Sequence, residues 1–269
     1  MGKNIKVFNY GWPKEMKFSE FDFPDGQPHI KFEDKVLDDV LIKCRLTNPH
    51  DLFDLMLICE TLKRAGNTKT KRLHISYLMG ARMDRAISDL EPWTLNVVTG
   101  IINSLEFDEI QLFDVHSEVA VALLGATNLL SAPFVDRIID SLDKTNLIFV
   151  APDAGASKRV ETLARGLPIV QCLKHRDPET GKLSNFSMHT LLDLKGKDFL
   201  IVDDICDGGG TFIPIAKFFL EAGAKSVGLY VSHGIFSKGL PIEGINHIWT
   251  TNSYKNHENT DYLTVFNTF

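Results

Sequence analysis

The chain has 269 residues, of which 44% are apolar and 24% charged, as in ordinary globular proteins. This length suits one or two domains and buries enough surface to fold without disulfides or a structural metal. The formal net charge is −6. It argues against a non-specific nucleic-acid binder, because such proteins depend on a basic surface.

Cysteine usage and hydropathy indicate the compartment. The cysteines are widely spaced and form no CxxC pair, which predicts reduced, mostly buried thiols. No stretch reaches about 18 apolar residues, so no membrane span is expected. The first six residues lack the apolar core of a signal peptide. We therefore expect a cytoplasmic protein with no nucleic-acid or membrane partner.

The first half of the chain alternates short apolar runs with helical patterns. In the clearest helix, apolar residues recur every three or four positions and Gly66 follows as a C-cap. Pro92 opens the second helix, and Asp114 directly follows a strand. The predicted strands are 5–8, 29–32, 36–42, 73–78 and 110–113, and the predicted helices are 51–65 and 92–102.

The second half has the same alternation. Residues 147–150 are continuously apolar, as in a central parallel strand buried on both faces. Residues 175–185 are polar and are predicted to form a mobile excursion. The other predicted strands are 169–173, 199–202, 226–231 and 262–266, with helices at 157–165 and 211–222.

Strands that alternate with helices predict an α/β fold with largely parallel sheets. The two similar halves meet near residues 130–145, so we expect two domains, 1–135 and 136–269. The last strand is a candidate for returning to the first domain.

The strongest local signal follows strand 199–202. Asp203 and Asp204 come directly after this apolar run, where they could accept hydrogen bonds from a ribose diol. Glycines before a helix let successive backbone N–H groups converge on a phosphate. The competing interpretation is a plain glycine-rich turn. We call the segment the glycine loop; it consists of Asp207, Gly208, Gly209, Gly210 and Thr211.

This segment closely resembles the phosphoribosyl-diphosphate (PRPP) binding motif of the type I phosphoribosyltransferase fold. Further segments, in the same chain order, resemble motifs of ribose-phosphate diphosphokinases, also called PRPP synthetases. The chain is similar to a short, divergent member of that family. The segments are Phe23–Gln27, Tyr77–Arg85, Asp114–His116, Pro152–Arg159 and His233–Ser237.

The resemblance implies two type I phosphoribosyltransferase-like domains, each a mainly parallel sheet flanked by helices. Residues 1–135 would form the ATP side and 136–269 the ribose-phosphate side. The implied reaction transfers the diphosphoryl group of ATP to the 1-hydroxyl of ribose 5-phosphate, with Mg²⁺ as cofactor. Its products would be PRPP, a precursor in nucleotide biosynthesis, and AMP.

Catalytic and metal-binding roles are likewise implied by the resemblance. His116 would contact magnesium and the ATP phosphates, and Asp153 would be a second magnesium ligand. Lys174 and Arg176 would lie on a flexible catalytic loop and stabilise charge during transfer. The competing interpretations are a core histidine for His116, a helix N-cap for Asp153 and a solvated charge cluster for the loop.

The same resemblance implies a nucleotide site. Phe23 and Arg82 would sandwich the adenine ring through stacking and cation–π contacts, unless Phe23 is a core residue. In the family the loop carrying Phe23 comes from a neighbouring subunit, which implies a homodimer or a higher homo-oligomer. The other implied nucleotide-binding residues are Asp25, Gln27 and Asp84.

Several positions depart from the family motifs. Gln27 and Met83 replace a glutamate and a glutamine, so the nucleotide pocket loses polar contacts. Gly208 replaces a threonine, which widens the glycine loop. This loop could admit a ribose whose 5′-phosphate is esterified, such as ADP-ribose, to give ADP-ribose 1-diphosphate in NAD metabolism. The chain stops at Phe269 without the family's closing helix, so family-type allostery and a full hexamer are not expected.

Other functions compete with the diphosphokinase. A catalytically silent regulatory homologue should lose the cationic loop, the Asp-x-His segment or the paired acids, and this chain keeps all of them. A phosphoribosyltransferase that consumes PRPP needs one copy of the fold, whereas this chain carries two.

Overall fold

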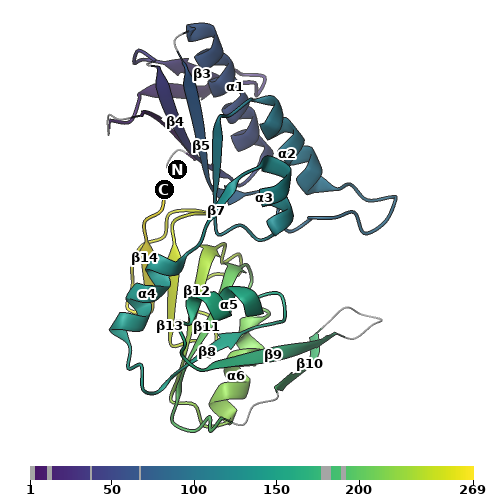
Figure 1. Ribbon diagram of the computed structural model, residues 1–269, viewed down its shortest axis with the longest axis vertical. Helices are drawn as coiled ribbons and strands as arrows, with labels where there is room; N and C mark the ends of the chain where they lie inside the picture. Colours follow the sequence, from purple (N-terminus) through teal and green to yellow (C-terminus); the bar gives the residue numbers. More distant parts are fainter. Residues whose placement is uncertain (1–3, 11–13, 37, 67, 177–182, 189–191) are drawn as a thin grey trace. The chain divides into compact units, whose positions relative to one another are not determined.

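The computed structural model describes residues 4–10, 14–36, 38–66, 68–176, 183–188 and 192–269. The chain forms two compact units, residues 1–130 together with Phe269, and residues 131–268 (Figure 1). Across these ranges, no helix has the length and apolar character needed to cross a bilayer.

The first unit contains a five-stranded sheet in the order β1-β4-β5-β6-β7. Strand β1 is antiparallel to β4, and the other neighbours are parallel. Strands β2 and β3 form a separate antiparallel hairpin. The strands are β1 (Ile5–Asn9), β2 (Phe18–Asp22), β3 (Pro28–Phe32), β4 (Asp39–Leu46), β5 (Thr70–Leu78), β6 (Glu109–Phe113) and β7 (Thr127–Leu129), and the helices are α1 (Pro49–Ala65), α2 (Thr94–Ser104) and α3 (Glu118–Leu124).

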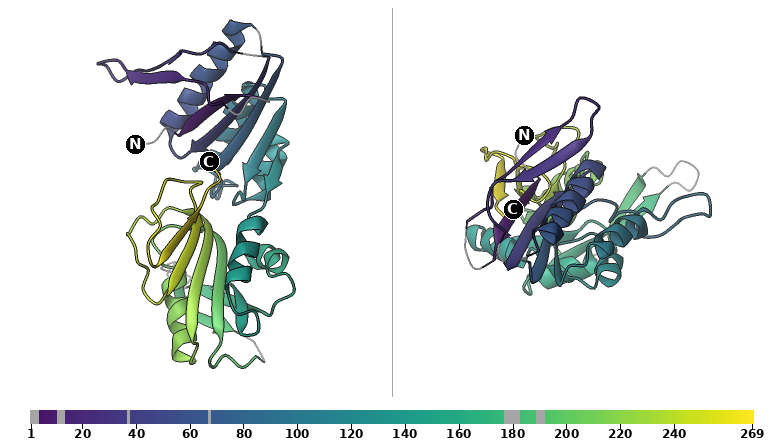
Figure 2. Two further views of the ribbon diagram at one scale, coloured as in Figure 1. Left: turned by 90° about the vertical axis from the view of Figure 1, so that its left-hand side faces the viewer. Right: turned by 90° about the horizontal axis from the view of Figure 1, so that it is seen from above.

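One face of this sheet carries the core of the first unit. Val40 and Ile42 of β4 are buried and the residues that follow each, Leu41 and Lys43, are half-buried. The buried positions join one cluster with α1, α2 and α3. Figure 2 shows α1 packed along this sheet. Helix α1 begins at Pro49, two residues before the predicted start, because Asn48 and Asp51 cap it reciprocally, and it ends as predicted before Gly66, whose φ is 72°.

The second unit contains a seven-stranded sheet in the order β10-β9-β8-β11-β12-β13-β14. Only the β10–β9 pair is antiparallel among its described strands. The strands are β8 (Leu147–Ala151), β9 (Ile169–Arg176), β10 (Leu183–Met188), β11 (Asp198–Cys206), β12 (Ser226–Gly234), β13 (His247–Thr251) and β14 (Leu263–Phe266), and the helices are α4 (Ala132–Ser141), α5 (Ser157–Leu163) and α6 (Phe212–Glu221).

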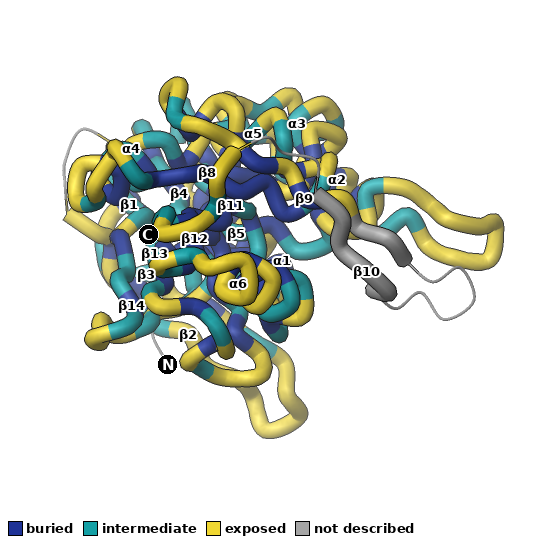
Figure 3. Tube along the Cα trace, turned by 90° about the horizontal axis from the view of Figure 1, so that it is seen from below, coloured by how far each residue is buried: buried dark blue, intermediate teal, exposed yellow. Residues whose placement is uncertain are grey.

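Helices cover both faces of this second sheet. Phe199 and Ile201 face α6, whereas Leu200 and Val202 face α4 and α5. Strand β8 is buried at every position, which confirms the prediction of a central strand, and Figure 3 shows β8, β11 and β12 largely buried. Together the two sheets confirm the predicted α/β class with mainly parallel strands.

Several predicted elements need correction. Part of the excursion expected at 175–185 is an antiparallel ribbon, because β9 runs to Arg176 and pairs with β10. Strand β11 extends to Cys206, so Asp203 and Asp204 lie within the strand rather than after it. The elements that the sequence analysis did not predict are β2, α3, β7, α4, β10 and β13.

Candidate functional site

The glycine loop connects the carboxyl end of β11 to the first turn of α6. Gly209 adopts a φ of +77°, a left-handed conformation that favours glycine. Its carbonyl oxygen accepts the N–H groups of Phe212 at 2.9 Å and Ile213 at 3.0 Å. The predicted strand–loop–helix arrangement is therefore present, with a tight turn at its centre.

The space around the loop differs from one glycine to the next. A Cβ atom on Gly209 would lie 3.4 Å from Cγ2 of Ile242, which packs against the loop. A Cβ on Gly210 would meet nothing within 4 Å. The loop is thus supported at Gly209 and open at Gly210, and it can present backbone N–H groups to an anion there.

The segment after β12 is bonded to the loop. The N–H groups of Ile235 and Phe236 donate to the Cys206 carbonyl at 2.9 and 3.2 Å, and that of Ser237 donates to the Asp207 carbonyl at 3.2 Å. The structure therefore places the His233–Ser237 motif beside the glycine loop. His233 itself is buried, and its Nδ1 lies 2.7 Å from the hydroxyl of Ser253.

Asp203 and Asp204 form a tightly coupled pair at the end of β11. The Asp204 N–H donates to Oδ1 of Asp203 at 2.9 Å. Burial raises the pKa of Asp203 well above its usual range, the negative charge of Asp204 raises it further, and Arg159 acts in the opposite direction. Asp204 is only 3% exposed. The pair therefore stands at the edge of the buried core.

Arg159 of α5 contacts the acidic pair, and the predicted set does not include it. Its Nη1 lies 3.6 Å from Oδ1 of Asp204, and both side chains are largely buried. A buried carboxylate needs such a partner, because an unpaired charge away from water is strongly unfavourable. The signal was present in the sequence, since Arg159 closes the Pro152–Arg159 motif.

Asp153 follows β8 and organises the start of α5. Its Oδ1 accepts the N–H of Ala156 at 3.0 Å, and its carbonyl accepts the Ser157 hydroxyl at 3.3 Å. These bonds brace the turn before the helix and do not cap it, because the N-cap residue of α5 is Ala156 and no side chain caps it, so the capping interpretation is wrong. They are compatible with a ligand role, because a carboxylate has acceptor capacity on both oxygens.

In the first unit, two predicted segments meet at the carboxyl ends of β5 and β6. Asp84 accepts a hydrogen bond from the Ser117 hydroxyl at 2.8 Å. Ser117 also caps α3, and the neighbouring His116 is exposed. Asp114 is fully buried with a φ of +42°. The structure thus brings Asp84 close to the His116 segment and excludes a core position for His116.

The tip of the β2–β3 hairpin carries the other predicted nucleotide residues. Phe23 is 47% exposed, and its ring lies 5.3 Å from that of Phe21 and 5.8 Å from that of His29. Gln27 donates to Asp25 through Nε2 at 2.8 Å. Exposed aromatic rings on a hairpin tip are not core residues, so the core interpretation of Phe23 is wrong. Arg82 is exposed on the segment after β5.

Lys174 and Arg176 lie on β9, with Lys174 opposite Phe186 and Arg176 opposite Leu183 of β10. Their side chains lie outside the described part of the structure. The cationic pair thus belongs to a β-ribbon at the edge of the second sheet.

The cysteines behave as predicted, since all four are buried and free of disulfides. Burial raises the pKa of Cys206 to about 12 and that of Cys59 to about 11. Thiols with such pKa values are not nucleophiles at neutral pH.

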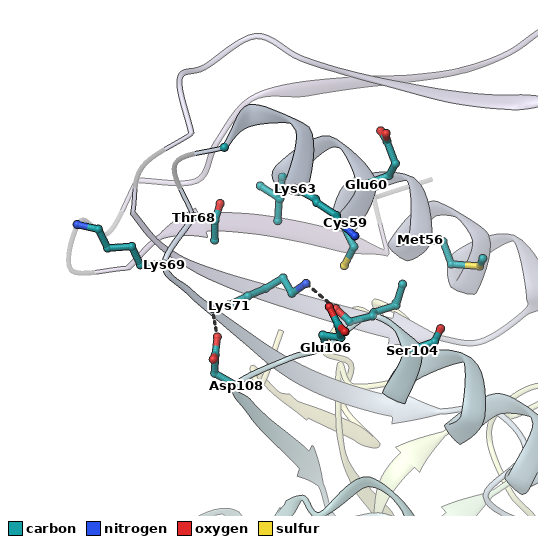
Figure 4. Close-up of a pocket in the computed structure, with 13 residues that line it drawn as sticks. Met56, Cys59, Glu60, Lys63, Thr68, Lys69, Lys71, Ser104, Glu106 and Asp108 are labelled. Atoms are coloured by element: carbon teal, nitrogen blue, oxygen red, sulfur yellow. Dashed lines mark hydrogen bonds between the residues drawn. The ribbon is translucent and has the colours of Figure 1, made fainter.

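A pocket of about 590 Å³ lies at the other end of the first unit's sheet (Figure 4). It is bordered by the ends of α1 and α2, by Lys71 near the start of β5 and by Asp108 before β6. The Lys71 ammonium donates to the Leu105 carbonyl, and the Asp108 carboxylate accepts the Lys71 N–H at 2.6 Å. At this end the Leu105 carbonyl has a cationic partner, whereas Arg82 and Asp84 of the predicted nucleotide site follow the opposite, carboxyl end of β5.

Comparisons with known proteins identify the family. A family model described as phosphoribosyl transferase domain matches residues 130–261. The ribose-phosphate pyrophosphokinase of Mycoplasma pneumoniae is 30% identical over 227 residues, covering 82% of this chain and 68% of the relative. The ribose-phosphate pyrophosphokinase of Sulfurisphaera tokodaii is 30% identical over 241 residues, covering 86% of this chain and 82% of the relative.

The fold agrees with these relatives. The crystal structure of phosphoribosylpyrophosphate synthetase from Mycobacterium smegmatis superposes with a TM-score of 0.82 at 22% identity, covering 94% of this chain and 86% of that one. The likeness confirms a fold of two phosphoribosyltransferase-like domains. The chain belongs to the ribose-phosphate pyrophosphokinase, or PRPP synthetase, family.

Proposed function

We propose that this protein transfers the diphosphoryl group of ATP to the 1-hydroxyl of ribose 5-phosphate, giving PRPP and AMP. A new bond joins the sugar oxygen to the β-phosphorus, and the bond from that phosphorus to the α-phosphate oxygen breaks. The observation that carries the proposal is the glycine loop, a tight glycine-rich turn between β11 and α6 in a chain of this family.

The second unit would bind the acceptor. Backbone N–H groups of the glycine loop would hold the 5′-phosphate, because those of Phe212 and Ile213 at the start of α6 already donate to the Gly209 carbonyl. Asp203 would accept a hydrogen bond from a ribose hydroxyl, while Arg159 pairs with Asp204 and holds it in place. Positioning of this kind supplies much of the barrier reduction in phosphoryl transfer.

The first unit would bind the nucleotide. Arg82 and Phe23 are exposed and can stack on a purine. Asp84 and Gln27 would hold polar groups of the nucleotide through hydrogen bonds. His116 would bind the ATP phosphates, and Lys174 and Arg176 would neutralise charge on the moving diphosphate. The Phe23 loop would act on a neighbouring subunit.

Magnesium is proposed as the cofactor. Asp153 fits it through a hard carboxylate oxygen, and His116 offers an exposed imidazole nitrogen, a weaker ligand for Mg²⁺. No cluster of three metal-ligating side chains occurs among the residues that the structure describes. Mg²⁺ commonly binds through one or two carboxylates together with substrate phosphates. When bound, it neutralises phosphate charge.

The second candidate keeps the reaction and changes the acceptor to ADP-ribose. It is favoured by Gly208, which leaves the loop without a side chain where the family motif has a threonine. An acceptor with an esterified 5′-phosphate has to continue past the loop, and beside Gly208 it would meet the flexible side chain of Lys238 instead of a threonine side chain.

The test is release of AMP from Mg-ATP with each acceptor, measured by chromatography against a control without acceptor. A rate above that background with ribose 5-phosphate supports the first candidate, and with ADP-ribose the second. We expect His116→Ala to lower kcat by at least about 100-fold with the preferred acceptor. Background rates with both acceptors would favour a silent homologue, and release of diphosphate from PRPP with a free base would favour a phosphoribosyltransferase.

A further inference from the structure

The side chain of Lys238 covers Gly208 of the glycine loop. A Cβ atom on Gly208 would lie 3.1 Å from both Cδ and Cε of Lys238 and 3.3 Å from its Cγ. The alkyl chain therefore lies along the glycine, in space that a side chain at position 208 would claim. The ammonium nitrogen is one bond beyond Cε, so it stands close to the loop.

The backbone around Lys238 keeps it there. The preceding residue, Ser237, donates its N–H to the Asp207 carbonyl at 3.2 Å. Gly239 follows with a φ of +84°, and its N–H donates to the Phe236 carbonyl at 3.0 Å. Lys238 thus sits in a tight turn that is bonded to the loop.

Its charge is available to a ligand. Lys238 is exposed, and within the described ranges its ammonium forms no ion pair with a carboxylate. By contrast, Lys225 at the other end of the same sheet is paired with Asp198 at 3.0 Å. A lysine placed by the backbone beside a phosphate-binding turn, with no acidic partner, is suited to an anion.

We propose that Lys238 is a specificity-determining residue that binds the second phosphate of an acceptor carrying a 5′-diphosphate ester, such as ADP-ribose. This inference rests on the proposed function and selects the substrate class of the same site. Gly208 and Lys238 act together, because the absence of a side chain at 208 lets the lysine reach the loop.

The charge distribution of the two acceptors explains the preference. A phosphate monoester concentrates a charge of about −1.5 to −2 on a single phosphorus at neutral pH, which the N–H groups of the glycine loop can bind alone. A diphosphate diester spreads its charge over two phosphorus atoms. The glycine loop holds only one of these two phosphate groups. The second phosphate group needs a cation beside the loop, where Lys238 lies.

The test measures acceptor binding by calorimetry without ATP, and AMP release with ATP, for both acceptors. Lys238→Met keeps the alkyl chain and removes the charge. We expect it to weaken ADP-ribose binding about tenfold, the scale of one charge-assisted hydrogen bond, and ribose 5-phosphate binding by less than about twofold. Lys238→Arg should retain most of the affinity, and Lys225→Met is the matched control for loss of a positive charge.

Coupling between the two positions provides a second readout. Gly208→Thr should displace the Lys238 side chain and weaken ADP-ribose binding about as much as Lys238→Met. Combining both substitutions should add little to either alone, because they remove the same contact.

Any of three results overturns the inference. These are equal weakening of the binding of both acceptors by Lys238→Met, unchanged ADP-ribose binding in that variant, and failure of the wild-type protein to bind ADP-ribose. Retained ADP-ribose binding with the expected Lys238 effect but no AMP release with either acceptor would instead overturn the proposed function and leave the role of Lys238 standing.

Discussion

Asp203 combines a proposed role in acceptor binding with a cost to the stability of the fold. Its carboxyl is desolvated and faces the negative charge of Asp204, so its pKa in the folded protein is raised. A plain turn would not need two adjacent acids at this place. Acidic pairs that lower the stability of the folded protein are typical of residues that act on a ligand.

We predict that Asp203→Asn stabilises the protein while impairing acceptor use. Between the unfolded-chain pKa of about 4 and the raised folded pKa, the folded state binds the extra proton, so the free energy of unfolding of the wild type falls as pH rises. Asp203→Asn has no carboxyl at this position to lose a proton. Its free energy of unfolding should therefore exceed that of the wild type by on the order of 1 kcal/mol at the upper end of that pH range.

Chemical denaturation across pH 4 to 8 measures this gain. Asp198→Asn is the control in the same strand, because Asp198 is paired with Lys225 and Ser226; it should give no stabilisation. A constant stability difference between Asp203→Asn and the wild type across that range would contradict the prediction.

At the scale of elements, the start of α1 illustrates how the helices are specified. Oδ2 of Asp51 accepts the Thr47 N–H at 2.7 Å and the Asn48 N–H at 3.1 Å, and Oδ1 accepts Nδ2 of Asn4 at 2.9 Å. Asp51 is buried. One carboxylate thus joins the helix start to the end of β4 and to the N-terminal segment.

Asp51→Ala should destabilise the protein by about 2 kcal/mol, because several buried donors lose their acceptor. Asp54→Ala, in the same helix, is the control and should change the free energy of unfolding by less than about 0.5 kcal/mol. The midpoint of urea unfolding measures both. Equal effects of the two substitutions would show that the cap is not the cause.

The same scale shows where sequence patterns are sufficient. Helix α1 and strand β8 were predicted because a 3.6-residue period and a continuous apolar run are local signals. The end of β11 was predicted too early, since polar Asp203 and Asp204 look like a loop although β12 continues the ladder beside them. The extension of β9 to Arg176 and its partner β10 were missed, because pairing between these strands compensates for the polar sequence there.

At the scale of the whole molecule, we propose that the Phe23 hairpin completes the nucleotide site of a neighbouring subunit. Phe21, Phe23 and His29 form an exposed aromatic cluster at its end. Exposed aromatic side chains of this kind suit a protein interface or a stacking ligand.

We predict that Phe23→Ala and Lys174→Ala complement each other when the two inactive chains are mixed. In a twofold dimer, each mixed pair contains one site with neither substitution, so random exchange restores about a quarter of the wild-type sites. AMP release after subunit exchange measures this recovery. Activity no higher than the sum of the separate chains would place Phe23 and Lys174 in the same chain's site.

The amino-acid sequence by itself determined the α/β class, the two-unit organisation, the family and the order of the glycine loop and its neighbouring motifs. These are encoded in local periodicity and in short motifs that can be read without knowing which parts of the chain meet. Only the tertiary structure decided that Arg159 pairs with Asp204, that Asp84 contacts Ser117 and that Lys238 covers Gly208. Such contacts join residues 30 or more positions apart, and it is the folding of the sheet that brings them together.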